Sequence, residues 1–141
     1  MKKIAILGST GSIGSILVDI IKKDRLNFDV KLLSCSSNFK LLFKQASALN
    51  VKNLIITDKK TFLKVIKIHK YRKFKIYNNF EVFSHIFKKK IDYCMSAISG
   101  IYGLVPTCSV IQYCNNLAIA NKEAIICGWP IINYYLNKLT H

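Results

Sequence analysis

The fold is decided by a stretch near the amino terminus, residues 4–14, which reads IAILGSTGSIG. The apolar run that opens it favours a β-strand and stops at Gly8, and the residues from Ser12 onward favour a helix. In the tight turn between them, Gly11 lets the backbone come close to a pyrophosphate, and Gly14 lets the helix pack against the strand. Because free N–H groups at the start of a helix attract an anion, the stretch predicts a phosphate-binding turn.

The spacing of this turn is G-x-x-G-x-x-G, which differs from the more common dinucleotide-binding spacing G-x-G-x-x-G. A turn whose glycines serve only steric needs is therefore the alternative interpretation. Its position directly after an amino-terminal strand favours nucleotide binding, and Thr10 and Ser12 add hydroxyl donors. In the helix that follows, the apolar residues that recur at helical spacing are Ile13, Ile16, Leu17, Ile20 and Ile21.

The composition predicts one domain and argues against a protein that reads nucleic acid. The chain has 141 residues, of which 51% are hydrophobic, enough for a single core of ordinary size. Its formal net charge is +15, but every basic residue except Arg25 and Arg72 is a lysine, whereas nucleic-acid recognition favours arginine. Half of the basic residues lie in residues 59–90, away from the glycine turn, where a solvated face is favoured over a docking patch. We therefore rank a nucleic-acid binder last among the hypotheses.

The cysteines predict a reducing compartment. They are odd in number and scattered, without the spacing of a zinc site or a disulfide framework: Cys35, Cys94, Cys108, Cys114 and Cys127. Since the chain also shows no cleavable signal segment, we expect a cytoplasmic protein. Cys127 and Trp129 are expected in the core.

Residues 93–121 carry no charged side chain and exceed the length of a membrane-spanning helix. Glycine, proline and amide residues interrupt this run, and lipid would penalise the amide groups. We therefore expect a buried strand, a loop and an amphipathic helix here, and no membrane segment.

Strand and helix patterns alternate along the rest of the chain. Further strands are predicted over residues 30–35, 53–57, 74–77, 91–98 and 116–120. Helices are predicted over residues 39–49, 59–69, 79–88, 106–113 and from Ala124 onward, the last with a kink at Pro130. In the helix over residues 39–49, the predicted buried stripe is Leu41, Leu42, Gln45, Ala46 and Leu49. The alternation predicts the α/β class: a doubly wound, mostly parallel sheet with helices on both faces, as in NAD(P)-binding Rossmann-like domains.

The end of the second strand bears on the choice of cofactor. In an NAD-binding Rossmann unit an acidic residue here holds the ribose 2′-hydroxyl, whereas this strand ends in Ser34-Cys35-Ser36-Ser37-Asn38. The absence of an acid favours NADP, because an acid would repel the 2′-phosphate. Ser36, Ser37 and Asn38 can donate hydrogen bonds to a phosphate, and Lys40 supplies positive charge. The alternative is that these residues only cap the following helix.

Two later loops are expected at the same edge of the sheet, because ligands in open α/β sheets lie outside the carboxyl ends of the strands. The first spans Ser99–Gly103, and the second is Asn121-Lys122-Glu123. A lysine at a strand end can bind a substrate phosphate, and a neighbouring glutamate can accept a hydrogen bond from a ribose. The alternative is an exposed helix start in which the helix dipole favours the acid. Expected outside these loops, as surface or packing residues, are His69, His85 and His141.

Together these motifs resemble the amino-terminal part of the 1-deoxy-D-xylulose 5-phosphate reductoisomerase family. The matching segments are Gly8–Gly14, Ser99–Gly100 with Gly103–Thr107, and Ala118–Glu123, in the same order and spacing. The resemblance covers the whole chain but only about the first third of the family's enzyme. It implies that residues 1–141 form the NADPH-binding Rossmann domain of a homodimeric, divalent-metal enzyme of non-mevalonate isoprenoid biosynthesis. That enzyme rearranges its substrate and reduces the aldehyde intermediate with NADPH to 2-C-methyl-D-erythritol 4-phosphate.

The resemblance also implies roles for single residues. Implied to bind NADPH are Thr10, Gly11, Ser12 and Ile13 at the diphosphate, Asn38 near the adenosine-side phosphate, and Asn121 and Glu123 at the nicotinamide-side ribose. Implied to bind the phosphorylated substrate is Lys122. Ser36 and Ser37 stand where the family commonly has glycine followed by lysine or arginine. The best partner of the 2′-phosphate is thus missing, which weakens the expected NADPH preference unless Lys40 substitutes.

No acidic residue follows Glu123, whereas the family's metal carboxylates lie farther along a much longer chain. The sequence therefore offers no ligands for the Mg²⁺ or Mn²⁺ that the resemblance implies, and no catalytic residue is predicted. We expect the metal-binding and carboxyl-terminal domains to be absent and the 141 residues alone to be inactive. An excised domain, a split-gene product and a degraded copy all agree with the sequence. The second hypothesis is a noncatalytic nucleotide-binding or interaction module.

Overall fold

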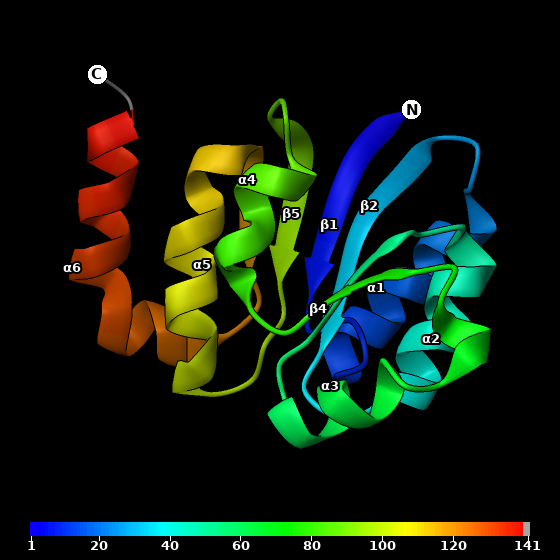
Figure 1. Cartoon of the computed structure of the whole chain (residues 1–141). Coiled ribbons are helices and arrows are strands. Elements are labelled where there is room, and N and C mark those ends of the chain that lie inside the picture. Colours follow the sequence, from blue (N-terminus) through cyan, green and yellow to red (C-terminus); the bar gives the residue numbers. More distant parts are fainter. Residues whose placement is uncertain (140–141) are drawn as a thin grey trace.

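The computed structural model describes residues 1–139 and shows one sheet covered by helices on both faces (Figure 1). Within these residues the strands are all parallel and lie in the order β4-β3-β2-β1-β5-β6. The strands are β1 (Lys2–Leu7), β2 (Phe28–Cys35), β3 (Asn53–Ile56), β4 (Lys75–Tyr77), β5 (Ile91–Ser96) and β6 (Cys114–Ile119). The α-helices are α1 (Ser12–Lys23), α2 (Phe39–Leu49), α3 (Lys59–Val65), α4 (Phe83–Ile86), α5 (Leu104–Val110) and α6 (Lys122–Leu139). Short 3-10 turns are η1 (His69–Tyr71), η2 (Phe80–Val82), η3 (Ile101–Gly103) and η4 (Ile111–Tyr113).

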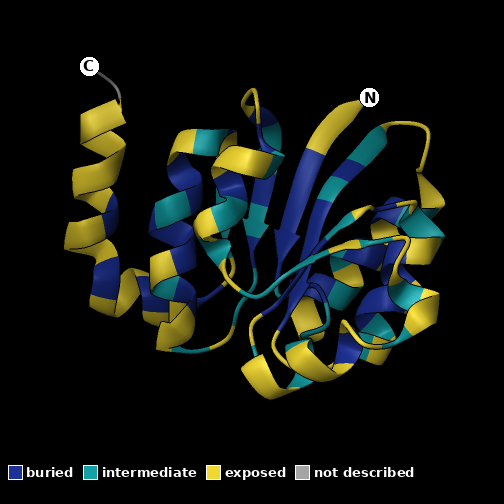
Figure 2. Cartoon of the chain, viewed as in Figure 1, coloured by how far each residue is buried: buried dark blue, intermediate teal, exposed yellow. Residues whose placement is uncertain are grey.

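The side chains of β1 alternate between two buried clusters on opposite faces of the sheet. Ile4 and Ile6 pack with residues of α1 and α2, whereas Ala5 and Leu7 pack with residues of α4 and α5. A parallel strand that is covered on both faces exposes neither row of side chains, which explains its nearly continuous apolar sequence. Figure 2 shows the buried residues gathered in the central strands and on the inner sides of the helices. The predicted doubly wound α/β fold is confirmed.

The order in which strands are added reverses at β1. The strands β2, β3 and β4 follow on one side of it, and the chain then crosses back to place β5 and β6 on the other side. The connections that leave β1 and β5 therefore run in opposite directions from their carboxyl ends, where the arrowheads lie in Figure 1. This is the switch point at which open α/β sheets form a ligand crevice.

The helix predicted over residues 59–69 is shorter in the structure. It begins after Asp58, whose Oδ2 accepts a hydrogen bond from the Thr61 amide at 2.8 Å, as expected for an N-cap. It ends at Val65, because Ile68 takes an extended backbone with φ −86° and ψ 113°. Only the turn η1 follows before β4.

The helix predicted over residues 79–88 is replaced by η2 and the four-residue helix α4. Helical geometry ends at Phe87, whose backbone has φ −103° and ψ 87°. The Phe87 ring is buried and lies within about 6 Å of the rings of Phe83 and Tyr113. We attribute the early end to this aromatic packing, which places the ring inside the core at the expense of a further helical turn.

Several element boundaries near the crevice also differ from the prediction, among them the start of α5, which is Leu104 instead of residue 106. Strand β5 ends at Ser96 instead of residue 98, because its pairing with β6 ends where Ser96 lies opposite Ile119. The next residues, 97 and 98, belong to the loop that approaches the glycine turn. Helix α6 begins at Lys122 instead of Ala124 and continues through Pro130.

The apolar residues of α1 lie on two sides of the helix. Val18 and Ile21 are buried against the sheet, whereas Ile13, Ile16 and Ile20 are exposed. The helical spacing of these residues predicted the helix correctly. It did not predict which of them the sheet covers.

Helix α6 packs on α5 and lies outside it, away from the centre of the sheet (Figure 1). Its buried residues are Ala124, Gly128 and Ile132. The expectation that Cys127 and Trp129 lie in the core is wrong, because both are exposed. The sheet ends at β6 within the described residues, so it offers no surface that could cover the outer side of α6.

No helix within residues 1–139 combines the length and the apolar character that crossing a membrane requires. The uncharged run over residues 93–121 instead contributes most of β5, all of α5 and β6, and the loops between them. His69 and His85 are exposed, as expected, and His141 lies outside the described residues.

Candidate nucleotide-binding site

A cavity of about 390 Å³ lies at the switch point between the carboxyl ends of β1 and β5. It is lined by the glycine turn after β1, by the end of β2 with Ser36, and by the loop after β5. Thr57, Phe80 and Tyr102 complete its wall. The sequence interpretation missed Thr57 and Phe80, because neither carries a local pattern that separates a ligand wall from an ordinary turn or core position.

Two glycines of the turn are required by the fold itself. Gly8 has φ +78°, and a Cβ at this residue would lie 2.7 Å from the carbonyl oxygen of Ala97. A Cβ at Gly14 would lie 2.2 Å from the carbonyl oxygen of Gly8. Both neighbours are backbone atoms that cannot move aside, so the steric interpretation is correct for Gly8 and Gly14.

Gly11 is different. Its φ of −73° suits any residue, and a Cβ there would meet the carbonyl oxygens of Gly8 and Ala97 at 3.5 and 3.8 Å, which are ordinary contact distances. Protein packing therefore does not demand a glycine at this position, and the missing side chain leaves space in the wall of the cavity.

The start of α1 is open to an anion. Gly11 is the N-cap residue and makes no side-chain capping bond, and the first turn of the helix contains no acidic residue. The amides of the first turn have no partners within the helix. A negatively charged group beside Gly11 would satisfy these amides and interact favourably with the helix dipole.

The residues after β2 divide into one that lines the cavity and others that shape the loop. Ser36 lines the cavity, and its carbonyl oxygen accepts a hydrogen bond from the Asp58 amide at 3.1 Å. Asn38 caps α2 by accepting from the Leu41 amide at 3.4 Å, so the capping interpretation describes its side chain in this structure. Ser37 and Lys40 are exposed beside it.

A second cavity, of about 310 Å³, adjoins the start of α1 and brings the last predicted loop to the same edge of the sheet. Its wall contains Ser12 and Ile13 from α1 and Lys122 and Glu123 from α6. The side chains of Lys122 and Glu123 are exposed in the first turn of α6. The loops predicted to converge at the carboxyl edge therefore do so.

The side chain of Asn121 is buried and fully engaged within the protein. Its Nδ2 donates to the carbonyl oxygens of Ile98, at 2.6 Å, and of Gly100. Its Oδ1 accepts from the amides of Glu123 and Ala124 at 2.8 and 3.4 Å. Asn121 is thus the N-cap that starts α6 early, and it joins the loop after β5 to the end of β6.

The described residues do not fit the divalent metal that the family resemblance implies. In residues 1–139 no three His, Cys, Asp or Glu side chains come together as a metal site. Cys35 lines the cavity, but burial raises the pKa of its thiol to about 12. It is therefore a neutral thiol at physiological pH and not a nucleophile.

A doubly wound parallel sheet with an open glycine turn at its switch point defines a domain of the Rossmann-like class. The chain belongs to the 1-deoxy-D-xylulose 5-phosphate reductoisomerase family, whose model matches residues 4–128. A reductoisomerase of Pelagibacter ubique is 53% identical over 140 residues, which are 98% of this chain and 36% of that protein. One of a Wolbachia strain from Culex pipiens is 36% identical over 133 residues, which are 94% of this chain and 34% of that protein. The chain thus spans about a third of the length of these curated relatives.

Solved structures of reductoisomerases share the fold. The enzyme of Zymomonas mobilis in complex with NADPH superposes with a TM-score of 0.86 at 24% identity, over 99% of this chain and 37% of that chain. A reductoisomerase in complex with NADPH, fosmidomycin and magnesium superposes with a TM-score of 0.85 at 22% identity, over 98% of this chain and 34% of that chain.

Proposed function

We propose that residues 1–141 form a single NADPH-binding domain that serves a reductoisomerase, which converts 1-deoxy-D-xylulose 5-phosphate to 2-C-methyl-D-erythritol 4-phosphate in non-mevalonate isoprenoid biosynthesis. The observation that carries the proposal is Gly11, which packing does not require and which stands beside the uncapped start of α1. A diphosphate would fill the space that Gly11 leaves and accept hydrogen bonds from the helix amides. The complex of the Zymomonas mobilis enzyme with NADPH supports the same assignment.

In this proposal each predicted residue acts at one part of the cofactor or substrate. The diphosphate contacts Thr10, Gly11, Ser12 and Ile13, the adenosine-side phosphate lies near Asn38, and the nicotinamide-side ribose lies near Asn121 and Glu123. Because the Asn121 amide is already engaged, its contact with the cofactor uses the main chain. Lys122 holds the phosphorylated substrate by charge. Bound NADPH would supply the hydride that reduces the rearranged aldehyde.

Replacement of Gly11 by alanine tests the diphosphate site. We expect Gly11→Ala to cost about 1 kcal/mol of stability, because its Cβ meets only ordinary contacts but alanine is a much poorer N-cap than glycine. We expect it to weaken NADPH binding at least about tenfold, because the methyl group occupies the path of the diphosphate. Fluorescence titration and urea unfolding measure the two effects. Unchanged NADPH affinity in Gly11→Ala would contradict the site, and no binding by the unmodified chain would favour a noncatalytic interaction module.

Cofactor choice follows from the end of β2. No acid is present there to repel a 2′-phosphate, so NADPH should bind more tightly than NADH. The difference in affinity between NADPH and NADH should be small, because only hydroxyl and amide groups and the exposed Lys40 are available to bind the 2′-phosphate. A charge-assisted hydrogen bond is worth about 1.5–3 kcal/mol, so Ser37→Arg should widen the preference about tenfold or more. Parallel titrations with both cofactors decide this, and equal or tighter NADH binding by the unmodified chain would refute it.

The chain alone should not turn over substrate. Holding and polarising a phosphorylated hydroxyketone requires a divalent cation, which needs several oxygen ligands, and the described residues supply no such site. We expect no oxidation of NADPH by the purified chain with 1-deoxy-D-xylulose 5-phosphate and Mg²⁺ or Mn²⁺. Activity should appear when the remaining part of the Pelagibacter ubique relative is co-expressed with it. Metal-dependent NADPH oxidation by the chain alone would refute this.

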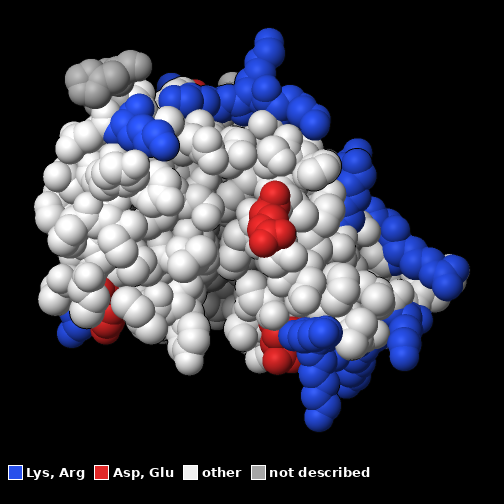
Figure 3. All heavy atoms as spheres, turned by 60° about the vertical axis from the view of Figure 1, so that its left-hand side comes forward, with Lys and Arg blue, Asp and Glu red and all other residues white. Residues whose placement is uncertain are grey.

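Exposed apolar side chains of η3, α5 and α6 support a division of the enzyme between this chain and further polypeptide. Tyr102, Val105, Ile126, Trp129 and Tyr134 are each between 48% and 84% exposed. Figure 3 shows that this side of the molecule carries few charged side chains, although the chain is strongly basic. An exposed apolar surface of this kind marks an interaction site. We propose that the additional polypeptide of the longer relatives covers it, and Trp129→Lys should then abolish the activity regained by co-expression without lowering NADPH affinity.

We place the protein in the cytoplasm because Cys35, Cys94, Cys108, Cys114 and Cys127 are free thiols. We expect a homodimer in the complete enzyme, as the family resemblance implies, and no nucleic-acid or membrane partner. Sedimentation of the co-expressed assembly measures whether the complete enzyme is a homodimer.

A further inference from the structure

A buried glutamine of α2 holds the glycine turn from behind. Gln45 is 2% exposed and Ser9 is fully buried. Ser9 Oγ donates to Gln45 Oε1 at 2.8 Å, and Gln45 Nε2 donates to the carbonyl oxygen of Ser9 at 2.8 Å. The two residues are 36 positions apart in the chain, so this reciprocal pair is a tertiary contact and not part of the turn itself.

The contact continues into the end of β2. The Ser9 amide donates to the carbonyl oxygen of Ser34 at 2.8 Å, and the Gly8 amide donates to Ser34 Oγ at 2.9 Å. Ser15 Oγ from α1 also donates to the carbonyl oxygen of Ser9, at 3.3 Å. Ser9 therefore joins β2, α1 and α2 at the first turn residue after Gly8.

The core does not explain a glutamine at this position. The neighbouring buried residues of α2, Leu42, Phe43 and Ala46, are all apolar and pack with the sheet. Burial of an amide is costly unless its polar atoms are paired, and an aliphatic side chain of similar volume would avoid this cost. Both polar atoms of the Gln45 side chain form hydrogen bonds with Ser9. The contact specifies where Ser9 lies.

We propose that Gln45 is a positioning residue for the cofactor. It fixes the main chain of Ser9, so that Thr10, Gly11 and the first amides of α1 are held in place for the diphosphate. It also couples this turn to α2, whose capped start adjoins Ser36 in the cavity wall. Gln45 itself touches no cofactor. The inference rests on the proposed function, because it requires that the turn binds a diphosphate.

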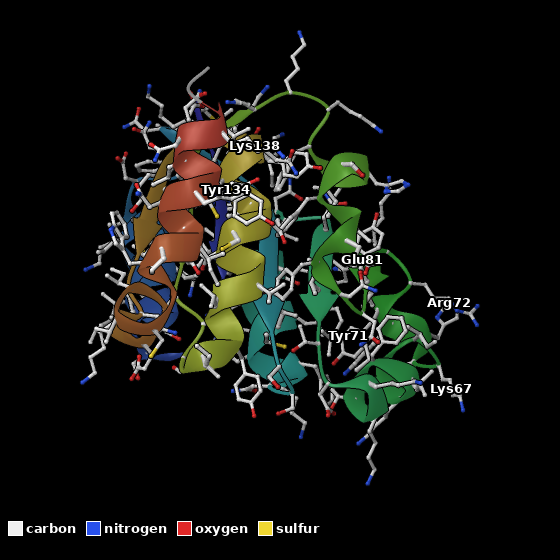
Figure 4. All side chains as sticks on the ribbon, turned by 90° about the vertical axis from the view of Figure 1, so that its left-hand side faces the viewer. Lys67, Tyr71, Arg72, Glu81, Tyr134 and Lys138 are labelled. Atoms are coloured by element: carbon white, nitrogen blue, oxygen red, sulfur yellow. The ribbon has the colours of Figure 1, made fainter. Side chains whose placement is uncertain are left out.

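The test compares two variants of the same helix. Gln45→Met keeps the length of the side chain but removes both hydrogen bonds to Ser9. The matched control is Phe43→Leu, which changes a buried α2 residue whose ring stacks on Tyr71 at 3.7 Å. Figure 4 shows Tyr71 on the opposite side of the view from α6. Melting temperature, affinity for NADPH and affinity for adenosine 2′-monophosphate, which lacks the diphosphate, are measured below the melting range of every variant.

We expect both variants to lower the melting temperature. Gln45→Met should weaken NADPH binding about tenfold, as expected for two lost hydrogen bonds. The affinity of this variant for adenosine 2′-monophosphate should stay within about twofold of the unmodified chain. Phe43→Leu should leave both affinities within about twofold. A loss of NADPH affinity that is equal in the two variants, or absent in both, would overturn the inference. Failure of the unmodified chain to bind NADPH would instead refute the proposed function.

The milder Ser9→Ala variant tests the same contact if Gln45→Met does not fold. It removes only the hydroxyl and should weaken NADPH binding several-fold. In a double-mutant cycle, adding Ser9→Ala to Gln45→Met should lower NADPH affinity by less than the product of the single effects, because both act through one contact. Unchanged NADPH affinity in folded Ser9→Ala, or full multiplication of the two effects, would contradict the inference.

Discussion

The two sides of the crevice are held by different means. On the side of β1, the glycine turn is locked by backbone atoms: the positions of Cβ atoms at Gly8 and Gly14 are blocked by carbonyl oxygens. On the side of β5, Gly100 has φ +73° and a Cβ at Gly103 would lie 2.9 Å from the carbonyl oxygen of Ile98, and the loop is further tied by the side chain of Asn121. An added methyl group should therefore strain either side, and the second side also depends on the amide of Asn121.

The helices that cover the two halves differ as well. Helix α1 lies over the central strands and buries Val18 and Ile21 there, whereas α6 lies over α5 and buries Ile132 there; each helix also leaves isoleucines exposed on its other side. Position and not composition decides which isoleucines are buried, because both helices are rich in isoleucine and each buries only those that face its neighbour. An apolar helical pattern predicts a helix, and only the neighbouring elements decide how much of it is buried.

The largest effect is expected from a methyl group at Gly14. Gly14→Ala should destabilise the chain by about 3 kcal/mol and abolish NADPH binding, because the Cβ would lie 2.2 Å from the carbonyl oxygen of Gly8. The matched control is Gly128→Ala in α6, whose Cβ would also meet an atom at 2.2 Å, but one at the end of the Leu104 side chain. That side chain can move, and alanine is the better helix former by about 1 kcal/mol, so the net cost should be close to zero. Urea unfolding of both variants checks the contrast, and equal destabilisation would contradict it.

Removal of the Asn121 amide should have the next largest effect. Asn121→Ala loses the cap of α6 and the tie to the loop after β5, and should cost about 2–3 kcal/mol. Asn121→Ser restores a capping oxygen but not the donors to Ile98 and Gly100, and should recover about 1 kcal/mol. Thermal unfolding monitored by circular dichroism measures both. Equal stability of the alanine and serine variants would show that the cap contributes nothing.

Shortening one buried side chain in α1 and one exposed side chain in α6 should have different effects on stability. Val18→Ala removes apolar contacts from a side chain that is 1% exposed and should cost about 2 kcal/mol. Ile126→Ala acts on a side chain that is 75% exposed and should change stability by less than about 0.5 kcal/mol. Denaturant unfolding of the isolated chain tests the pair. A large cost at Ile126 would show that α6 is covered in solution.

The smallest expected effect is the pH response of one helix cap. The Thr61 hydroxyl and amide donate to Asp58 and hold the pKa of its carboxyl below the ordinary 3.8. Because the folded pKa is the lower one, the stabilisation is complete above about pH 4 and is lost as the pH falls through the folded value. Asp58→Asn should therefore flatten the acid limb of the stability profile. The cap of α2, Asn38, has no titratable group, so Asn38→Ser should leave that limb unchanged.

Much of the fold was predictable because the decisive signals are local. The β1 run, the glycine turn and the helix after it lie within residues 4–23, and Asn38 and Asp58 mark the starts of α2 and α3 through their own side chains. The convergence of loops at one edge followed from parallel strand order alone. The early end of α4 was not predictable, because the Phe87 ring packs against Tyr113, which is distant in the sequence.

The sequence by itself determined the class of the fold, the edge of the sheet at which the site lies and the resemblance to the family, because periodicity, glycine spacing and strand order are properties of neighbouring residues. Only the tertiary structure decided which residues hold that site in place. Gln45 was predicted to be buried, but its pairing with Ser9 depends on how α2 lies behind the glycine turn. Asn121 was predicted at the crevice, but its engagement with Ile98 and Gly100 depends on the pairing of β5 with β6. Hydrogen bonds between such distant segments depend on the packed arrangement of the elements, which no local pattern encodes.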